Sequence, residues 1–219
     1  MASGKFITFE GGEGSGKSTQ ARLLAEHLKA RGVDAVLTRE PGGSPFAERV
    51  RALLLDPAVP PHAPLSEALL FYAARADHLN KTIRPALAAG SWVICDRFSD
   101  STRVYQGAAG GLGAEALAAL ERLVVAPTSP DLTFILDLAP ADGLARARAR
   151  GSANSAGAAE TDPFERRDAA FHERLRVGYL SIATAEPQRC VLVDGGKAPD
   201  VTAAEIWADV ERRLLQAAP

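Results

Sequence analysis

The segment Gly11-Gly12-Glu13-Gly14-Ser15-Gly16-Lys17-Ser18-Thr19 decides the fold, because it fits the pattern G-x-x-x-x-G-K-[ST] between an apolar run and a helix-like pattern. Its glycines let backbone N–H groups turn toward phosphate oxygens. Lys17 supplies a charge toward the β- and γ-phosphates of a nucleotide, and the Ser18 hydroxyl can ligate Mg²⁺. The dipole of the following helix also favours anions. We therefore predict that all nine residues bind the phosphates of ATP.

Five short apolar runs, the first of them directly before this loop, predict the strands of a sheet. They are nearly continuously apolar, as expected for parallel strands covered on both faces, and longer helical patterns lie between them. This βαβ succession predicts an α/β protein in which helices wrap both faces of a five-stranded parallel sheet, and the phosphate loop indicates the P-loop NTPase fold. The predicted strands are Lys5 to Glu10, Val33 to Thr38, Trp92 to Cys95, Leu132 to Asp137 and Cys190 to Asp194.

Helical periodicity recurs between the strands, and small residues interrupt it twice. The Gly-rich stretch Gln106 to Gly113 is one break, and Gly151 to Ala159 is a second that predicts a mobile loop. We see no domain linker, so we expect residues 1–219 to form one domain. The predicted helices cover Gln20 to Ala30, Ala68 to Leu87, Glu115 to Val125 and Ala203 to Leu215.

The composition of the chain argues against several classes of protein. The formal net charge is -2 with both signs interspersed, which argues against a nucleic-acid binder or a membrane-surface protein and favours small-molecule partners. Cys95 and Cys190 each lie inside an apolar run, which is typical of reduced core thiols. No apolar run approaches the roughly 20 residues that span a bilayer. We expect a cytoplasmic protein.

An acidic residue and a basic residue stand next to each other directly after the third predicted strand. Asp96 can serve Mg²⁺ or its waters, while Arg97 offers two parallel donors to a phosphate. This pair suits an acceptor that is itself a phosphate. A regulatory GTPase would need a guanine-reading N-K-x-D segment, and Asn80-Lys81 is followed by Thr82 and Ile83, so that class is disfavoured.

Further short motifs follow the phosphate loop in a fixed order. They are Thr38-Arg39-Glu40-Pro41-Gly42-Gly43, Leu70-Phe71-Tyr72-Ala73-Ala74-Arg75, Asp96-Arg97-Phe98, Ser101-Thr102 and Tyr105-Gln106-Gly107, and then an arginine-rich segment. In order and spacing the chain resembles the thymidylate kinase family along nearly its whole length. The resemblance implies the nucleoside monophosphate kinase type of the P-loop fold. It also implies phosphorylation of dTMP to dTDP for dTTP synthesis, with ATP as donor and Mg²⁺ as cofactor, in a cytoplasmic homodimer.

The resemblance also implies roles in binding dTMP. Phe71 would stack on the thymine ring and Arg75 would hydrogen-bond a base carbonyl; the two lie four apart, on one helix face. Arg39 and Arg97 would hold the acceptor phosphate. Tyr105 would lie beside the sugar C2′, where its bulk disfavours a ribose hydroxyl. Thr102 and Gln106 match positions that contact the base, and Glu13 matches an acidic residue near the 3′-hydroxyl and phosphate.

The resemblance further implies a basic lid over about residues 145–166. Some thymidylate kinases carry a basic catalytic residue where this chain has Gly14; the others have glycine there and supply arginine from the lid. We favour Arg150 and Arg146, which share an i,i+4 face, over Arg148. The chain departs from close relatives by inserting SANSAGAAET before Asp162, and Pro163 replaces a usual arginine, so that Arg166 or Arg167 would substitute.

We expect catalysis by positioning and charge stabilisation. Lys17 and Mg²⁺, ligated through Ser18 and Asp96, would hold the donor phosphates while Arg97 and the lid arginines act on the transferring group. A phosphate oxygen of the acceptor is already a nucleophile at pH 7, so no general base is required. The alternatives are a kinase of UMP, CMP or AMP, a non-catalytic ATP-binding switch, and an interaction protein with a vestigial loop.

Overall fold

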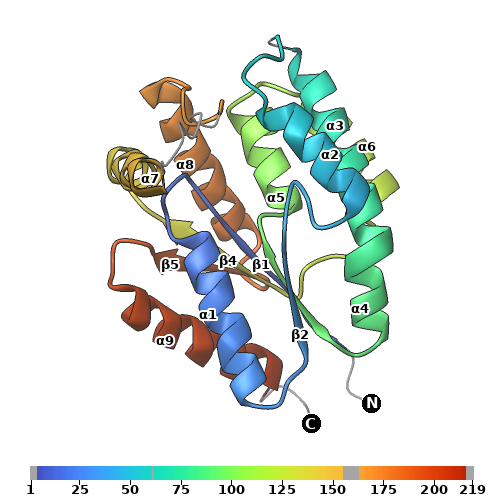
Figure 1. Cartoon of the computed structure of the whole chain (residues 1–219), viewed down its shortest axis with the longest axis vertical. Coiled ribbons are helices and arrows are strands. Elements are labelled where there is room, and N and C mark those ends of the chain that lie inside the picture. The colour runs from blue at the N-terminus through green and yellow to red at the C-terminus, as the bar shows by residue number, and fades with distance from the viewer. Residues whose placement is uncertain (1–3, 61, 155–162, 216–219) are drawn as a thin grey trace.

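A parallel five-stranded sheet forms the centre of the molecule (Figure 1). The computed structural model describes residues 4–60, 62–154 and 163–215, with the side chains of 151–154 left out. The strand order is β2-β3-β1-β4-β5, and every neighbouring pair is parallel, which confirms the predicted sheet. The strands are β1 (Phe6–Gly11), β2 (Ala35–Arg39), β3 (Trp92–Asp96), β4 (Leu132–Asp137) and β5 (Cys190–Asp194).

The strand register gathers polar residues at one edge of the sheet. Arg39 is paired with Asp96 across β2 and β3, and Asp137 with Asp194 across β4 and β5. The central strand β1 is buried along its whole length and leads directly into the phosphate loop. Because parallel strands end at the same edge, the loop and these charged residues lie together there.

Helices cover both faces of the sheet. On one face, α1 (Lys17–Ala30) and α9 (Pro199–Val210) pack together over an apolar cluster that includes Ile7, Phe9 and Ile94. The other face carries helices that bury Phe6, Val93 and Ile135. Those helices include α3 (Pro64–His78), α4 (Arg84–Ala88), α5 (Ser99–Thr102) and α8 (Ala169–Ala185), with the π-helical segments η1 (Leu79–Ile83) and η2 (Arg103–Ala108).

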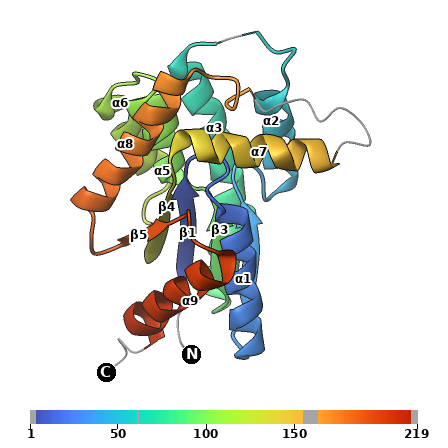
Figure 2. The same cartoon turned by 90° about the vertical axis from the view of Figure 1, so that its left-hand side faces the viewer.

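Three further helices frame the polar edge or the outside of the molecule. Helix α2 (Pro45–Leu55) packs on α3, and α6 (Ala114–Val124) packs on α3 and η2. Helix α7 (Pro140–Asn154) lies across the carboxyl ends of the strands (Figure 2). A last π-helical segment, η3 (Glu211–Leu215), continues α9.

Several sequence-based boundaries were wrong. The second strand begins at Ala35 rather than Val33, because the turn after α1 takes up the residues before it. The first break is partly helical, since Gln106 to Ala108 belong to η2. Of the predicted loop Gly151 to Ala159, residues 151–154 continue α7, and the rest lies outside the described residues. Helices α2, α5, α7 and α8 were not among the predicted helices.

The structure also bears on the predicted state of the cysteines and on the predicted lack of a membrane-spanning helix. Cys95 and Cys190 are both free and buried, as predicted. Among the described residues, no helix has the length and apolar character needed to cross a bilayer. The single domain and the cytoplasmic location stay predictions.

Candidate functional site

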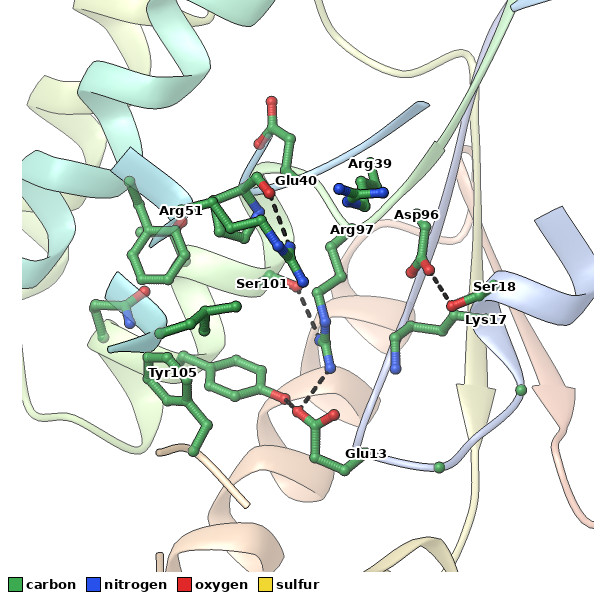
Figure 3. Close-up of a pocket in the computed structure, with 18 of the residues that line it drawn as sticks. Glu13, Lys17, Ser18, Arg39, Glu40, Arg51, Asp96, Arg97, Ser101 and Tyr105 are labelled. Carbon is green, nitrogen blue, oxygen red and sulfur yellow. Dashed lines mark hydrogen bonds and ion pairs between the residues drawn. The ribbon is translucent and has the colours of Figure 1, made fainter. Parts of the chain in front are cut away.

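A cavity of about 220 Å³ opens where β1, β2 and β3 end (Figure 3). Its walls come from the phosphate loop, the ends of β2 and β3, and helices α2, α3, α5, α7 and η2. Most of the residues predicted to act line it. They are Glu13, Gly14, Gly16, Lys17, Ser18, Arg39, Phe71, Asp96, Arg97, Thr102, Tyr105, Gln106 and Arg150.

The phosphate loop is wound as the motif predicts. Gly11, Gly14 and Gly16 have φ of 135°, 67° and 101°, in a region that L side chains rarely adopt. Lys17 is 7% exposed, and its Nζ donates to the carbonyl oxygen of Gly12 at 2.7 Å. Burial, and then the charge of Arg97, lower the pKa of Lys17 to about 8. The buried ammonium therefore favours an anion beside it.

Ser18 and Asp96 form a pair that fits a hard cation. The Ser18 hydroxyl donates to Asp96 Oδ2, which joins the start of α1 to the end of β3 beside Lys17. Mg²⁺ prefers oxygen ligands and usually keeps waters and substrate phosphates as its other ligands. Across the described ranges, no three His, Cys, Asp or Glu side chains form a metal-holding group. The two oxygens thus suit a metal held mainly by a nucleotide.

Arg97 is the most constrained side chain of the cavity. Its Nη2 donates to Glu13 Oε1 at 2.8 Å, and its Nη1 donates to Gly11 O at 3.0 Å and to Ser101 Oγ and Tyr179 Oη, each at 3.2 Å. Its φ of 69° is in the left-handed region. Strain of this kind persists only where the surroundings fix it, and it gathers at functional sites. The guanidinium is fixed in the direction of the loop.

Glu13 is held ionised by that pairing. Burial alone would raise the pKa of this carboxyl, but the charges of Arg97 and Lys17 overcome it and lower the pKa to about 2. The Tyr105 hydroxyl donates to the same Oε1 at 2.6 Å, and the Arg97 guanidinium lies 5.1 Å from the Tyr105 ring centroid. Glu13, Arg97 and Tyr105 therefore form one contact group, seen at the lower part of Figure 3.

A second arginine pair lies on the β2 side. Arg39 Nη2 donates to both Glu48 oxygens at 3.2 Å. The Gly43 amide, and then Arg39, hold the pKa of Glu48 below its usual value. Arg51 of α2 also lines the cavity, donating from Nη1 to Pro41 O at 2.9 Å. Sequence analysis missed Arg51, since it belongs to none of the motifs and its helix was not predicted.

The opposite end of the cavity is apolar. Phe71 of α3 lies 6.1 Å from Phe164, centroid to centroid, and Tyr105 lies 5.6 Å from Phe164 in an edge-to-face arrangement. Leu55 completes this end. Phe164 and Leu55 were missed, because an apolar residue in a loop or at a helix end carries no motif. Flat apolar walls of this kind suit an aromatic ring.

Arg75 does not line the cavity; it lies buried against the cavity wall. Its Nε donates to Glu40 Oε2 at 2.7 Å, and its Nη2 donates to Phe98 O and Thr102 Oγ1, each at 3.1 Å. His78 shares the same carboxylate from the other side. Arg75 Nη1 is buried with no partner among the described residues. A buried donor without a partner costs folding free energy, so an acceptor supplied by a ligand would stabilise Nη1.

A close contact with α7 explains why the phosphate loop has glycine at position 14. A Cβ on Gly14 would lie 1.9 Å from the carbonyl oxygen of Gly143 in α7. Any side chain there would push α7 away from the loop. The close approach brings Arg150 of α7 to the main cavity. Gly14 and the arginine-bearing helix are thus two sides of one contact.

A second cavity, of about 380 Å³, adjoins the phosphate loop on the β5 side. Arg150 lines it too, and Arg146 Nη1 donates to Gly195 O at 2.7 Å on its wall. Gln20 Nε2 donates to Pro199 O, while Gln20 Oε1 is buried with no partner among the described residues. Of the predicted loop residues, Ser15 and Thr19 line this cavity, and Gly12 lines a smaller one behind the loop. Gly11 packs against Leu136 of β4 and Ser15. Arg148 lines neither main cavity.

Behind Arg97 lies a buried polar group that sequence analysis also missed. Glu10 accepts from the Phe98 amide at 2.8 Å and from the Ser101 hydroxyl at 2.6 Å, and Tyr179 Oη donates to it at 3.2 Å. Burial, and then the charge of Asp100, raise the pKa of Glu10 to about 7. This group joins β1, α5 and α8 around the guanidinium of Arg97.

Comparisons with known proteins identify the family to which this chain is similar. The family model described as thymidylate kinase matches residues 9–206. The chain is 55% identical over 214 residues to a thymidylate kinase of Caulobacter vibrioides, covering 98% of this chain and 99% of that one. It is 52% identical to one of Rhodopseudomonas palustris, covering 97% and 90%. The crystal structure of thymidylate kinase from Ehrlichia chaffeensis matches with a TM-score of 0.76 and 35% identity, over 95% of this chain and 99% of that one.

Proposed function

Because this chain belongs to the thymidylate kinase family and phosphorylates dTMP to dTDP, we propose that its 220 Å³ cavity binds dTMP. The observation that carries the proposal is the arrangement of Arg97 and Arg39. Both lie at strand ends and line the cavity together with Lys17, and each is paired with a carboxylate, Glu13 or Glu48. A dianionic phosphate can engage both guanidinium groups.

The polarity of the cavity orients the acceptor. Its phosphate lies between Arg97 and Arg39, and Arg51 adds a third guanidinium to that end. The thymine ring lies at the apolar end, stacked on Phe71. Arg75 Nη1 meets a base carbonyl at the wall, and Thr102 and Gln106 border the base. Tyr105 lies beside the sugar and excludes a ribose 2′-hydroxyl, while Glu13 accepts from the 3′-hydroxyl.

ATP is the donor, and its phosphates lie in the loop from Gly11 to Thr19. We place its base in the second cavity, because that cavity continues from the loop past Thr19 to Pro199. The buried Oε1 of Gln20 can accept from an amino group of the base. The two bases then lie at opposite sides of Lys17, and the phosphates meet above it.

Ser18 and Asp96 would hold Mg²⁺, directly or through water. The cation would neutralise charge that develops on the phosphate oxygens of ATP. Apart from the metal, charge stabilisation comes from this chain's own cations. Lys17 holds the donor phosphates, Arg97 holds the acceptor phosphate in line, and Arg150 and Arg146 of the lid helix reach the donor from the other side.

No residue of the site needs to remove a proton. The attacking group is an oxygen of the dTMP phosphate, which is ionised at neutral pH. Glu13 is committed to Arg97 and Tyr105, and its lowered pKa makes it a poor base. Catalysis therefore comes from positioning and from fixed positive charge. Closure of α7 over the donor phosphates would exclude water from the transferring group.

We also propose that the protein is a homodimer. Large apolar side chains are exposed on three neighbouring helices: Phe46 and Leu53 on α2, Leu65 and Leu69 on α3, and Leu123 on α6. Figure 1 shows these helices gathered on one side of the sheet. Contiguous exposed apolar surface commonly marks a protein interface. Light scattering after size exclusion should give twice the mass of 23.0 kDa, and a monomer mass would reject the proposal.

The acceptor assignment is tested by the release of ADP in a coupled assay. Wild-type protein with ATP and Mg²⁺ is offered dTMP, dUMP, UMP, CMP, AMP and GMP in turn. We expect the highest kcat/KM with dTMP. A dominant response to UMP, CMP or AMP would replace the acceptor while leaving the phosphate loop assigned. Release that no acceptor stimulates would point to a non-catalytic switch.

A further inference from the structure

Gln106 is held from behind by a carboxylate that does not reach the cavity. The side chain of Gln106 is 1% exposed and lines the apolar end of the acceptor cavity. Its Nε2 donates to Glu67 Oε1 at 2.6 Å. Glu67 lies in the first turn of α3 and is not among the lining residues. Glu67 therefore does not contact the acceptor itself, and Gln106 links it to the cavity.

The chemistry of this contact decides which end of the amide faces Glu67. An ionised carboxylate only accepts hydrogen bonds, whereas an amide has a donor end and an acceptor end. The NH₂ end of Gln106 must therefore face Glu67. The other oxygen of this carboxylate faces a cation, because Arg167 Nη2 lies 3.9 Å from Glu67 Oε2. The orientation thus follows from charge and not from the naming of atoms.

The fixed orientation leaves Gln106 Oε1 as the end that can meet a ligand. Within the part of the chain that the structure describes, no group donates to it. Arg75 Nη1 also has no partner among the described residues. Thr102 lies between Arg75 and Gln106 in the structure, because its hydroxyl accepts from Arg75 Nη2 and it precedes Gln106 by one helical turn. The base end of the cavity is therefore bordered by one free acceptor, Gln106 Oε1, and the unpartnered Nη1 of Arg75 lies buried behind the wall.

This pattern matches one class of pyrimidine base. Thymine and uracil carry a donor at N3–H and an acceptor at O4, whereas cytosine carries an acceptor at N3 and a donor at its 4-amino group. We infer that Glu67 is a specificity-determining residue, which fixes the amide of Gln106 so that the cavity accepts N3–H and rejects cytosine. The inference rests on the proposed acceptor cavity. Glu67 is a positioning residue, since it reaches the acceptor through Gln106.

A purely structural role for Glu67 predicts a different outcome. If the Glu67–Gln106 hydrogen bond only holds α3 and η2 together, its loss would lower kcat/KM for every acceptor by a similar factor. Loss of the fixed amide instead changes the ratio between acceptors, because a released Gln106 can turn and offer its NH₂ end to cytosine N3. The ratio of kcat/KM for dTMP to kcat/KM for dCMP is therefore the measurement that separates the two roles.

The test uses Glu67→Gln, whose amide can donate or accept and so no longer fixes Gln106. We expect its dTMP to dCMP ratio to fall tenfold or more, the size of effect that follows when one buried hydrogen-bonding group changes partner. Glu67→Ala, which removes the acceptor altogether, should give the same fall. Glu67→Asp, which keeps a carboxylate, should retain most of the wild-type ratio. Glu115→Gln is the control, an exposed glutamate on α6.

Gln106→Leu separates this inference from the cavity assignment. Its ratio should fall as well, and adding Glu67→Gln to it should change the ratio no further. If Gln106→Leu lowers the ratio and neither Glu67→Gln nor Glu67→Ala does, the role of Glu67 is overturned and the cavity stands. If Gln106→Leu also leaves the ratio unchanged, the base end of the cavity is wrongly assigned.

Discussion

The donor and acceptor sides of this site are built in different ways. The donor side is one continuous loop, in which backbone N–H groups and Lys17 come from nine neighbouring residues. The acceptor side is made of side chains from β2, β3, α2, α3, α5 and η2, and three of its cations, Arg39, Arg75 and Arg97, are paired with carboxylates. One side is preorganised by backbone conformation and the other by ion pairs. The comparison predicts that substitutions act differently on the two sides.

The largest effect is expected on the donor side. Lys17→Ala removes a buried charge that nothing else in the loop replaces, so kcat/KM for ATP should fall by about 10³-fold. Steady-state ADP release measures this. Lys29→Ala, an exposed lysine later in the same helix, should leave the rate near wild type. A loss of less than tenfold in Lys17→Ala would mean that the loop does not carry the donor phosphates.

On the acceptor side, the two arginines should not be equal. Arg97 is held by four hydrogen bonds, whereas the Arg39 side chain is 55% exposed and pairs only with Glu48 among the contacts described for it. Arg97→Ala should lower dTMP-dependent kcat/KM by roughly 10²-fold or more, and Arg39→Ala by about tenfold. The exposed Arg122→Ala serves as control. Near-full turnover by Arg97→Ala would remove it from the site.

The contact between loop and lid helix gives a smaller effect. Gly14→Ala places a methyl group against Gly143 O and forces alanine to a φ of 67°, so α7 must move. We expect kcat to fall about tenfold, with little change in dTMP affinity, since each 1.4 kcal/mol of barrier is tenfold in rate. Gly12→Ala is a matched control, because a Cβ there meets nothing within 4 Å. Equal behaviour of the two variants would contradict a role for this contact.

The smallest effect is a proton taken up by Lys17. Its pKa of about 8 in the free protein must rise when ATP phosphates bind, so binding takes up about half a proton at pH 8 and ATP affinity falls as the pH rises above 8. Calorimetry in buffers of different ionisation enthalpy measures the uptake. Lys17→Arg stays charged and should show none. Uptake by Lys17→Arg equal to wild type would assign the proton to another group.

The same comparison explains what could be predicted from the sequence. The loop, its lysine and the strand before it are contiguous, so their chemistry is visible without a fold. The pairs Arg97–Glu13 and Gln106–Glu67 join residues 84 and 39 positions apart, and only packing of the sheet and helices brings them together. The roles of Arg39, Phe71 and Gln106 came from family resemblance and stay predictions.

What sequence reasoning missed has physical causes as well. Arg51 and Leu55 lie on α2, whose short amphipathic pattern did not stand out, and Phe164 follows a segment with no regular pattern. Glu10 reads as an ordinary strand residue, although its burial and the bonds to Ser101 and Tyr179 make it a support for Arg97. A buried acid at the end of an apolar strand was the signal that could have found it.

The central claim is that Arg97 binds the acceptor phosphate while the base end of the cavity binds thymine independently. Isothermal titration of wild type and Arg97→Ala with dTMP and with thymidine tests it directly. In the wild type we expect dTMP to bind about 10²-fold more tightly than thymidine, as one lost charge-assisted contact implies. In Arg97→Ala most of that difference should vanish, with the affinity for thymidine unchanged. Equal weakening of both ligands would show that Arg97 supports the fold of the cavity and does not hold the phosphate.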